Sequence, residues 1–313
     1  MFINRTRSLS RRHMLSSGIA TFGITLALPS ISFSSTATSS IRAICMEDNT
    51  IVVATDHELL RISDAGDVVR VSHALAVTAL ANHPARPGTV LATLKDGGLS
   101  RSVDGGLTWA TIGSGLPAVQ ITALTMAALE PSMVYAALAG DGLWRSQDTG
   151  ETWEFVMDRP YLDGVEPDVL SLVSVGNPSG MGGIWLYAGT QAGLTRVPDC
   201  FCRWQDVTAG DAMDALAAGQ TPPSTAPLPN GEPVATLALA TKAPERIYAG
   251  LTSGLWASTD GGVNWALAST GAIGALAVNS SDPLSLAAAR DGGLSISRDG
   301  GATWTLSTPF KDI

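Results

Sequence analysis

The chain has 313 residues, a formal net charge of −9 and a hydrophobic content of 45%, enough for two ordinary domains or one large all-β domain. Residues 1–37 hold four arginines and no acid, so the remainder carries 15 basic and 28 acidic residues, a net charge of −13. This balance argues against nucleic acid or an anionic membrane surface as the main partner, because both select basic patches.

Residues 1–37 are expected to form an export signal. The stretch Ser10-Arg11-Arg12-His13-Met14-Leu15 resembles a twin-arginine signal, and an apolar run, Pro29 and the small residues 35–37 follow it. We therefore expect a cleaved signal and a periplasmic or other extracytoplasmic protein. The alternative is a retained N-terminal anchor in the inner membrane, which would be the chain's one membrane contact. Pro29 and the Ser/Thr content disfavour such a spanning helix.

An eight-residue motif recurs along the rest of the chain, and we call it the octad. Three full copies and one with Asn for Thr are Ser102-x-Asp104-x-Gly106-x-Thr108-Trp109, Ser146-x-Asp148-x-Gly150-x-Thr152-Trp153, Ser297-x-Asp299-x-Gly301-x-Thr303-Trp304 and Ser258-x-Asp260-x-Gly262-x-Asn264-Trp265. Weaker copies place Asp199 before Trp204 and Asp64 before Val69. The aspartates recur about every 40 residues once two insertions are allowed for, which is typical of propeller blades.

The pattern predicts an all-β protein in which residues 38–313 form a single six-bladed β-propeller, with seven blades as the alternative. In the second unit, short apolar runs at 77–81, 89–94 and 99–102 and a more polar run at 108–112 predict four antiparallel strands. Later units begin at 121, 169, 234 and 273. Each terminal blade has its own four strands, so we expect closure by packing between blades one and six.

Two insertions interrupt the repeat, at 158–168 and 208–233. Both join a fourth strand to the next first strand, which predicts that they lie on the face opposite the octads. Residues 211–218 could form one or two helical turns, and the Pro-rich remainder is expected to be irregular.

The octad itself is expected to fasten a hairpin turn. Its aspartate can accept backbone N–H groups, its glycine permits positive φ, and its tryptophan fills space between strands. An aspartate repeated in every blade is a poor candidate for a catalytic acid, which an active site needs once.

These octads resemble the BNR or Asp-box repeat. The longer unit, with Val134-Tyr135-Ala136 before Gly142-Leu143-Trp144 and Ile247-Tyr248-Ala249 before Gly254-Leu255-Trp256, resembles exported proteins related to the photosystem II stability/assembly factor family. The resemblance implies a propeller that acts as a binding platform for membrane-protein intermediates. Those relatives have seven blades and a basic face, whereas this chain predicts six blades and is acidic. Sialidases, sortilin-type receptor domains and xyloglucan-cleaving glycosidases share the box.

The residues give little support for catalysis. A sialidase-like Arg-Ile-Pro is represented only by Arg61-Ile62-Ser63, and three of the four tyrosines occupy equivalent second-strand positions that indicate core. A glycosidase needs two carboxylates across a cleft. Candidates for that role are Asp158, Asp163, Glu166 and Asp168 in the first insertion and Asp96, Asp141 and Asp291 in turns. Turns are commonly rich in aspartate, and the aromatic platforms of a sugar cleft are missing.

Metal and cofactor sites are not predicted. His57 and His73 with flanking acids make a weak metal candidate, and exposed turn histidines are usually solvated. The three cysteines cannot form a complete disulfide framework. Cys200 and Cys202 are expected to be free or weakly bridged thiols in a turn.

The sequence therefore predicts a non-enzymatic periplasmic propeller that binds a protein, as an assembly or stability factor or an accessory subunit of a membrane-bound complex. Loops on a rigid scaffold carry recognition, so the predicted contact residues are Tyr161, Leu162, Asp163, Glu166, Asp211 and Asp214. The alternative is a secreted carbohydrate-active hydrolase. A third possibility is a permanent subunit of a redox complex that keeps its N-terminus as an anchor.

Overall fold

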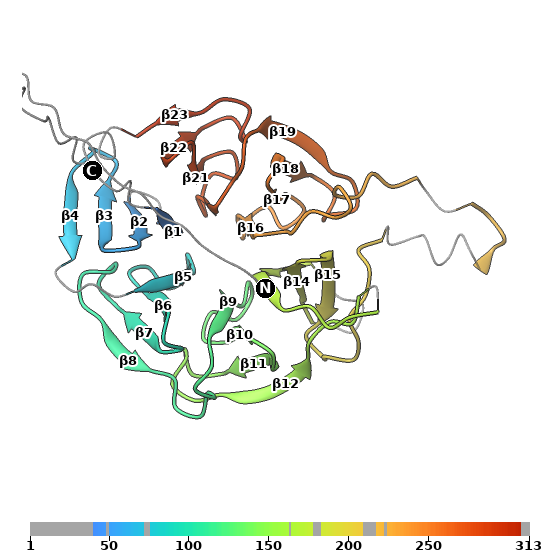
Figure 1. Cartoon of the computed structure of the whole chain (residues 1–313), viewed down its shortest axis with the longest axis horizontal. Coiled ribbons are helices and arrows are strands. Elements are labelled where there is room, and N and C mark those ends of the chain that lie inside the picture. The colour runs from blue at the N-terminus through green and yellow to red at the C-terminus, as the bar shows by residue number, and fades with distance from the viewer. Residues whose placement is uncertain are drawn as a thin grey trace, which may run out of the picture. The chain divides into compact units, whose positions relative to one another are not determined.

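Six antiparallel sheets form a ring in the computed structural model (Figure 1). The structure describes residues 40–47, 50–71, 76–162, 164–177, 183–208, 217–221 and 224–307. They belong to one compact unit, 37–313. In this part of the chain, no helix is long and apolar enough to cross a membrane. The predicted export signal at 1–37 lies outside the described residues.

Each sheet consists of consecutive strands. Blade 1 contains β1 (Ile41–Glu47), β2 (Thr50–Thr55), β3 (Leu59–Ser63) and β4 (Val68–Val71). Blade 2 contains β5 (Val77–Asn82), β6 (Val90–Leu94), β7 (Leu99–Ser102) and β8 (Ala110–Ile112). Blade 3 contains β9 (Ile121–Met126), β10 (Val134–Leu138), β11 (Gly142–Ser146) and β12 (Glu154–Asp158).

The second half of the ring repeats this order. Blade 4 contains β13 (Val169–Val175), β14 (Trp185–Thr190) and β15 (Gly193–Pro198). Blade 5 contains β16 (Thr236–Leu239), β17 (Ile247–Gly250), β18 (Gly254–Ser258) and β19 (Ala266–Thr270). Blade 6 contains β20 (Ala275–Val278), β21 (Leu286–Arg290), β22 (Gly293–Ser297) and β23 (Thr305–Leu306).

The prediction of a six-bladed all-β propeller is confirmed, and the seven-blade alternative is wrong. Blade 4 is the least regular blade, because its fourth position is held by a single antiparallel bridge between Arg196 and Gln205. Blades 1 and 6 each consist of their own consecutive strands. An apolar cluster that includes Ile44, Val53, Ala287 and Leu294 packs them together. Burial of apolar surface therefore closes the ring.

The core lies between neighbouring blades. The second strands are the most buried: every residue of β10 and of β17 is shielded from solvent. Their runs of apolar residues suit strands that are covered on both faces. Octad tryptophans join these layers, since Trp153 of blade 3 packs in a cluster with Leu91 and Leu99 of blade 2. Each octad thus ties its own blade to the preceding one.

The second insertion does not lie where the sequence predicted. The backbone N–H of Ala226 donates to Asn264 Oδ1 (2.7 Å), and the backbone N–H of Trp265 donates to the Ala226 carbonyl (2.7 Å), so this part contacts the octad of blade 5. Glu232 accepts hydrogen bonds from Thr252 and Ser253, in the turn at the other end of β17 and β18. The placement of this insertion on one face was wrong, because its last residues run along the blade from the octad end to the opposite end.

Candidate functional site

The octads form the turns between third and fourth strands. In the blade 3 copy, the Ser146 hydroxyl donates to Asp148 (2.8 Å), the Thr152 hydroxyl donates to the same carboxylate (2.6 Å), and Trp153 Nε1 donates to the Gly150 carbonyl (2.9 Å). Gly150 has φ of +91°, and a Cβ there would lie 2.8 Å from Ile112 Cδ1. The same serine–aspartate bond occurs at 102/104, 258/260 and 297/299.

Hydrogen bonding keeps these carboxylates ionised. Side-chain and backbone donation from the octad threonine lowers the pKa of Asp104, Asp148 and Asp299 to about 2 in each case. A carboxylate whose acceptor positions are occupied and whose pKa is this low cannot serve as a general acid near neutral pH. The octads therefore act as turn fasteners.

The two weaker copies are held differently. In blade 4, Trp204 Nε1 donates to the Asp158 carbonyl (2.9 Å), and Asp199 is followed by a disulfide between Cys200 and Cys202, with Cα atoms 5.5 Å apart. The two cysteines, which the sequence predicted to be free or weakly bridged thiols, thus form a disulfide. In blade 1, the backbone N–H of Asp67 donates to Ser63 Oγ (3.1 Å), within a turn that has no tryptophan.

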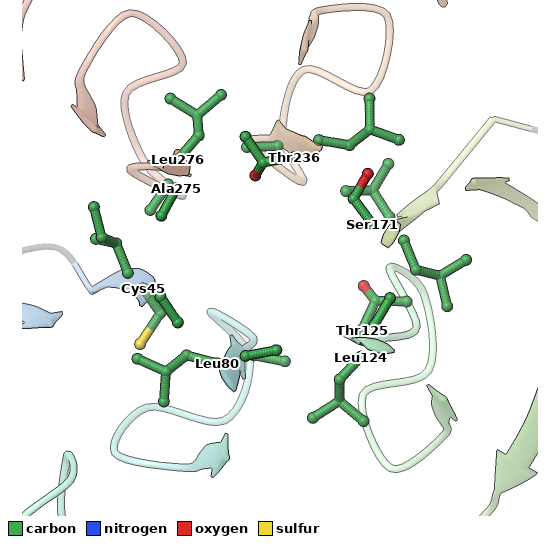
Figure 2. A pocket seen from close by; sticks show the side chains of 18 of the residues that line it. Cys45, Leu80, Leu124, Thr125, Ser171, Thr236, Ala275 and Leu276 are labelled. Atoms are coloured by element: carbon green, nitrogen blue, oxygen red, sulfur yellow. The ribbon is translucent and has the colours of Figure 1, made fainter. Parts of the chain in front are cut away.

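The central channel holds a cavity of about 220 Å³, lined by the six first strands. Figure 2 shows mostly aliphatic side chains around it, together with the hydroxyls of Thr125, Ser171 and Thr236 and the sulfur of Cys45. Arg42 is the one charged residue among those that line the cavity, and it pairs with Asp56. Because no carboxylate, histidine or aromatic side chain of the described chain lines this cavity, it lacks the paired acids of a glycosidase.

The first insertion forms a compact loop. Leu162 and Val165 pair through two backbone hydrogen bonds of 2.9 and 3.0 Å. The Arg159 guanidinium braces the loop, since it forms ion pairs with Glu166 (3.1 Å) and Asp168 (3.3 Å) and donates to the Glu166 carbonyl (2.8 Å). Asp168 also accepts the backbone N–H of Gly140 (2.9 Å), which ties the loop to the β10–β11 turn.

This loop exposes apolar surface at its tip. Tyr161 is 68% exposed and Val165 is 57% exposed, next to the backbone bonds between Leu162 and Val165. Leu162, predicted as the second anchor, is half-buried. The three other tyrosines, predicted as core, are buried at positions 135, 187 and 248. Burial raises the pKa of Tyr135 to about 12, so this side chain stays a neutral phenol.

Most carboxylates proposed for a hydrolase already serve local structure. Glu166 and Asp168 bind Arg159, and Asp141 accepts Trp144 Nε1 (2.6 Å). Asp96 accepts the Gly98 N–H (3.1 Å), and Asp291 pairs with Arg290 (3.0 Å). The contacts of the described residues show no pair of carboxylates that faces a cleft.

Several predicted residues cannot be placed. Asp163, Asp211, Asp214 and His73 lie outside the described residues. His57 lies in the β2–β3 turn, where its backbone N–H donates to Thr55 Oγ1 (3.3 Å). Within the described ranges, no group of three or more His, Cys, Asp or Glu side chains could hold a metal ion.

A cavity between blades 5 and 6, beside Trp304 and Arg290, was not predicted from the sequence. Two signals could have revealed it. Ser295 occupies the third-strand position where blades 3 and 5 have tryptophan, and four residues separate β19 from β20 where eight separate β8 from β9.

No family model matches the sequence, and no curated protein sequence matches it. Solved structures do resemble the chain. A GH74 enzyme from Niastella koreensis superposes with a TM-score of 0.60 at 13% identity, over 86% of this chain and 45% of that one. A structure of the COPII outer coat vertex on membranes gives 0.58 at 8% identity, over 86% and 70%. YCF48 bound to D1 peptide gives 0.48 at 15% identity, over 88% and 84%.

The chain is a β-propeller. At these identities the likeness establishes the fold alone, and the chain spans less than half the length of the GH74 enzyme. A hydrolase and a coat assembly share this fold, so the fold does not choose between catalysis and binding. The choice depends on the site.

Proposed function

We propose that this protein is a non-enzymatic propeller that binds a partner protein through the loop at 158–168. The observation that carries the proposal is the exposed Tyr161, held on a loop that Arg159 braces from within. Tyrosine is enriched among the residues that dominate binding energy. Internal bonds such as those of Arg159 reduce the conformational entropy that a loop loses on association, which favours affinity.

The charge around this loop suggests the chemistry of the partner. Glu166 keeps about half of its side chain exposed despite its pairing with Arg159, and the whole chain is acidic. We infer a partner surface with an apolar pocket for Tyr161 and a positively charged rim. The finer proposal is that this partner belongs to a membrane-bound complex, which the protein helps to assemble or stabilise.

Export is part of the same proposal. The basic and apolar segment at 1–37 supports a route to the periplasm, either with cleavage or with the segment kept as an anchor. The Cys200–Cys202 disulfide is compatible with an oxidising compartment. N-terminal sequencing of the protein from the periplasmic and membrane fractions tests this. A chain that starts at Met1 in the cytoplasmic fraction alone would contradict it.

The binding test compares Tyr161→Ala with Leu129→Ala. Leu129 is 69% exposed and lies in the β9–β10 turn, on the octad side of the blade, so it is a matched exposed apolar control. Affinity purification after gentle detergent extraction, followed by quantitative mass spectrometry, should show a protein retained by wild type and Leu129→Ala and depleted at least tenfold with Tyr161→Ala. A photo-crosslinker at position 161 should capture the same protein.

Equal recovery with both variants would refute the role of this loop. Turnover of a glycoside panel that is lost when Asp158 or Glu166 is changed to its amide would refute the non-enzymatic assignment.

A further inference from the structure

Two of the grooves between blades are filled by the chain itself. Between blades 2 and 3, Trp144 of β11 and Leu116 of the β8–β9 link pack beside the octad residue Trp153. Between blades 4 and 5, Trp256 of β18 and Leu228 pack beside Trp265. Leu116 and Leu228 are each followed by proline. The same pair of fillers, a third-strand tryptophan and a link leucine, thus occupies both grooves.

The links are seated in these grooves through their backbones. Ser114 forms a parallel bridge with Thr152 of the blade 3 octad. Ala226 makes the equivalent contact in blade 5, where its carbonyl accepts the Trp265 N–H and its N–H donates to Asn264. Each link therefore places a short segment beside an octad, a turn at 113–116 in the first case, and inserts a leucine two residues later.

The groove between blades 5 and 6 lacks both fillers. Ser295 replaces the third-strand tryptophan, and the link is only residues 271–274, too short to reach the octad. A cavity of about 380 Å³ lies there, lined by Trp304, Leu306, Ser295 and Arg290 among others. No described residue hydrogen-bonds to the backbone N–H of Trp304, the group equivalent to the Trp265 N–H.

The residues that line the cavity include an exposed leucine and an arginine with an unsatisfied donor. Leu306 is 41% exposed and lines the cavity together with Trp304. The Arg290 guanidinium lies 5.1 Å from the centre of the Trp304 ring, and its Nε donates to Asp291 (3.0 Å). Its Nη1 is buried and has no hydrogen-bond partner. A buried donor without a partner is costly and favours an acceptor from a ligand.

We propose that the groove between blades 5 and 6 binds an extended segment of a partner protein that carries an apolar residue followed by proline. The segment would add beside residues 303–305, place its apolar side chain against Trp304 and Leu306, and present an acceptor oxygen to Arg290. This mode is strand addition, in which backbone bonds give affinity and a side-chain pocket gives specificity. The inference rests on the proposed function only in taking the ligand to be protein.

The probe is a fluorescein-labelled peptide with the sequence of residues 224–233 (Ser-Thr-Ala-Pro-Leu-Pro-Asn-Gly-Glu-Pro), the segment that this chain seats between blades 4 and 5. Fluorescence polarisation with the full chain should show saturable binding. Leu306→Asp should weaken it at least tenfold, because a carboxylate would enter the apolar groove. Leu267→Asp is the matched control: Leu267 is 44% exposed at the equivalent position, in a groove that is already filled, and should leave binding unchanged.

A second peptide makes the test independent of protein variants. Leu228→Asp in the peptide should abolish binding to wild-type protein. The Tyr161→Ala protein should bind the unmodified peptide as the wild-type protein does. Failure of the peptide test and failure of the partner test at Tyr161 are therefore distinguishable. Absence of binding at millimolar peptide, or equal binding by Leu306→Asp and Leu267→Asp, would overturn the proposal. Binding that appears only after removal of residues 308–313 would identify the chain's own C-terminal end as the occupant and would also overturn it.

Discussion

The octad hairpin at 146–153 and the insertion loop at 158–168 are neighbours in sequence and are built alike. Each is braced by a network in which carboxylates accept several donors. They differ in where they place an aromatic residue: Trp153 is buried against blade 2, and Tyr161 faces solvent. A hydrogen-bonded network therefore contributes to stability where its aromatic residue packs against a neighbouring blade. Where no blade covers the aromatic residue, that side chain is available for recognition.

The largest expected effect separates the two aromatic residues by stability. Trp153→Ala should lower the free energy of unfolding by about 3–5 kcal/mol, because it leaves a cavity between blades 2 and 3. Tyr161→Ala should change it by no more than about 0.5 kcal/mol, because its surroundings are solvent. Urea unfolding followed by circular dichroism measures both. A comparable loss of stability in the two variants would show that Tyr161 contributes to the fold as much as Trp153 does.

The next effect concerns how the stability that the octads contribute depends on pH. Their aspartates have a pKa of about 2 in the folded protein, below the value of about 3.8 of an unperturbed carboxyl. As pH falls, the unfolded chain takes up protons first, so this stabilisation is present above about pH 4 and is lost as pH falls towards about 2. Urea midpoints between pH 5 and pH 2 should show the decline. The variant D104N/D148N/D299N should be less stable at pH 7 and should show a shallower decline below pH 4.

The smallest effect concerns the bracing of the insertion loop. Arg159→Ala should lower global stability by less than about 1 kcal/mol, because exposed ion pairs contribute little. It should still speed amide hydrogen exchange in residues 160–168, since the loop loses its internal donor, and should weaken partner binding. Arg145→Ala is the control, because Arg145 pairs with Glu154 outside the loop. Unchanged exchange after Arg159→Ala would show that Arg159 does not brace the loop.

The sequence predicted the blades well because their signals are local. Each octad bonds residues within four positions of one another, and each strand is bounded by its own turn residues. The candidate site was predicted only in part. Tyr161 was identified as the one tyrosine outside the repeat, whereas the role of Arg159 was missed, because its pairing with residues seven and nine positions later depends on the path of the loop.

The sequence by itself determined the number and order of the blades, because a hairpin needs only neighbouring residues and a repeat shows how often it occurs. The tertiary structure decided where the last residues of the second insertion lie and which groove, among the described residues, holds a cavity. Leu228 fills its groove only because Trp256 and Trp265 approach it from another blade. The cavity beside Trp304 exists because a short link and a serine meet at the same place. Such contacts join residues far apart in the chain, and only packing brings them together.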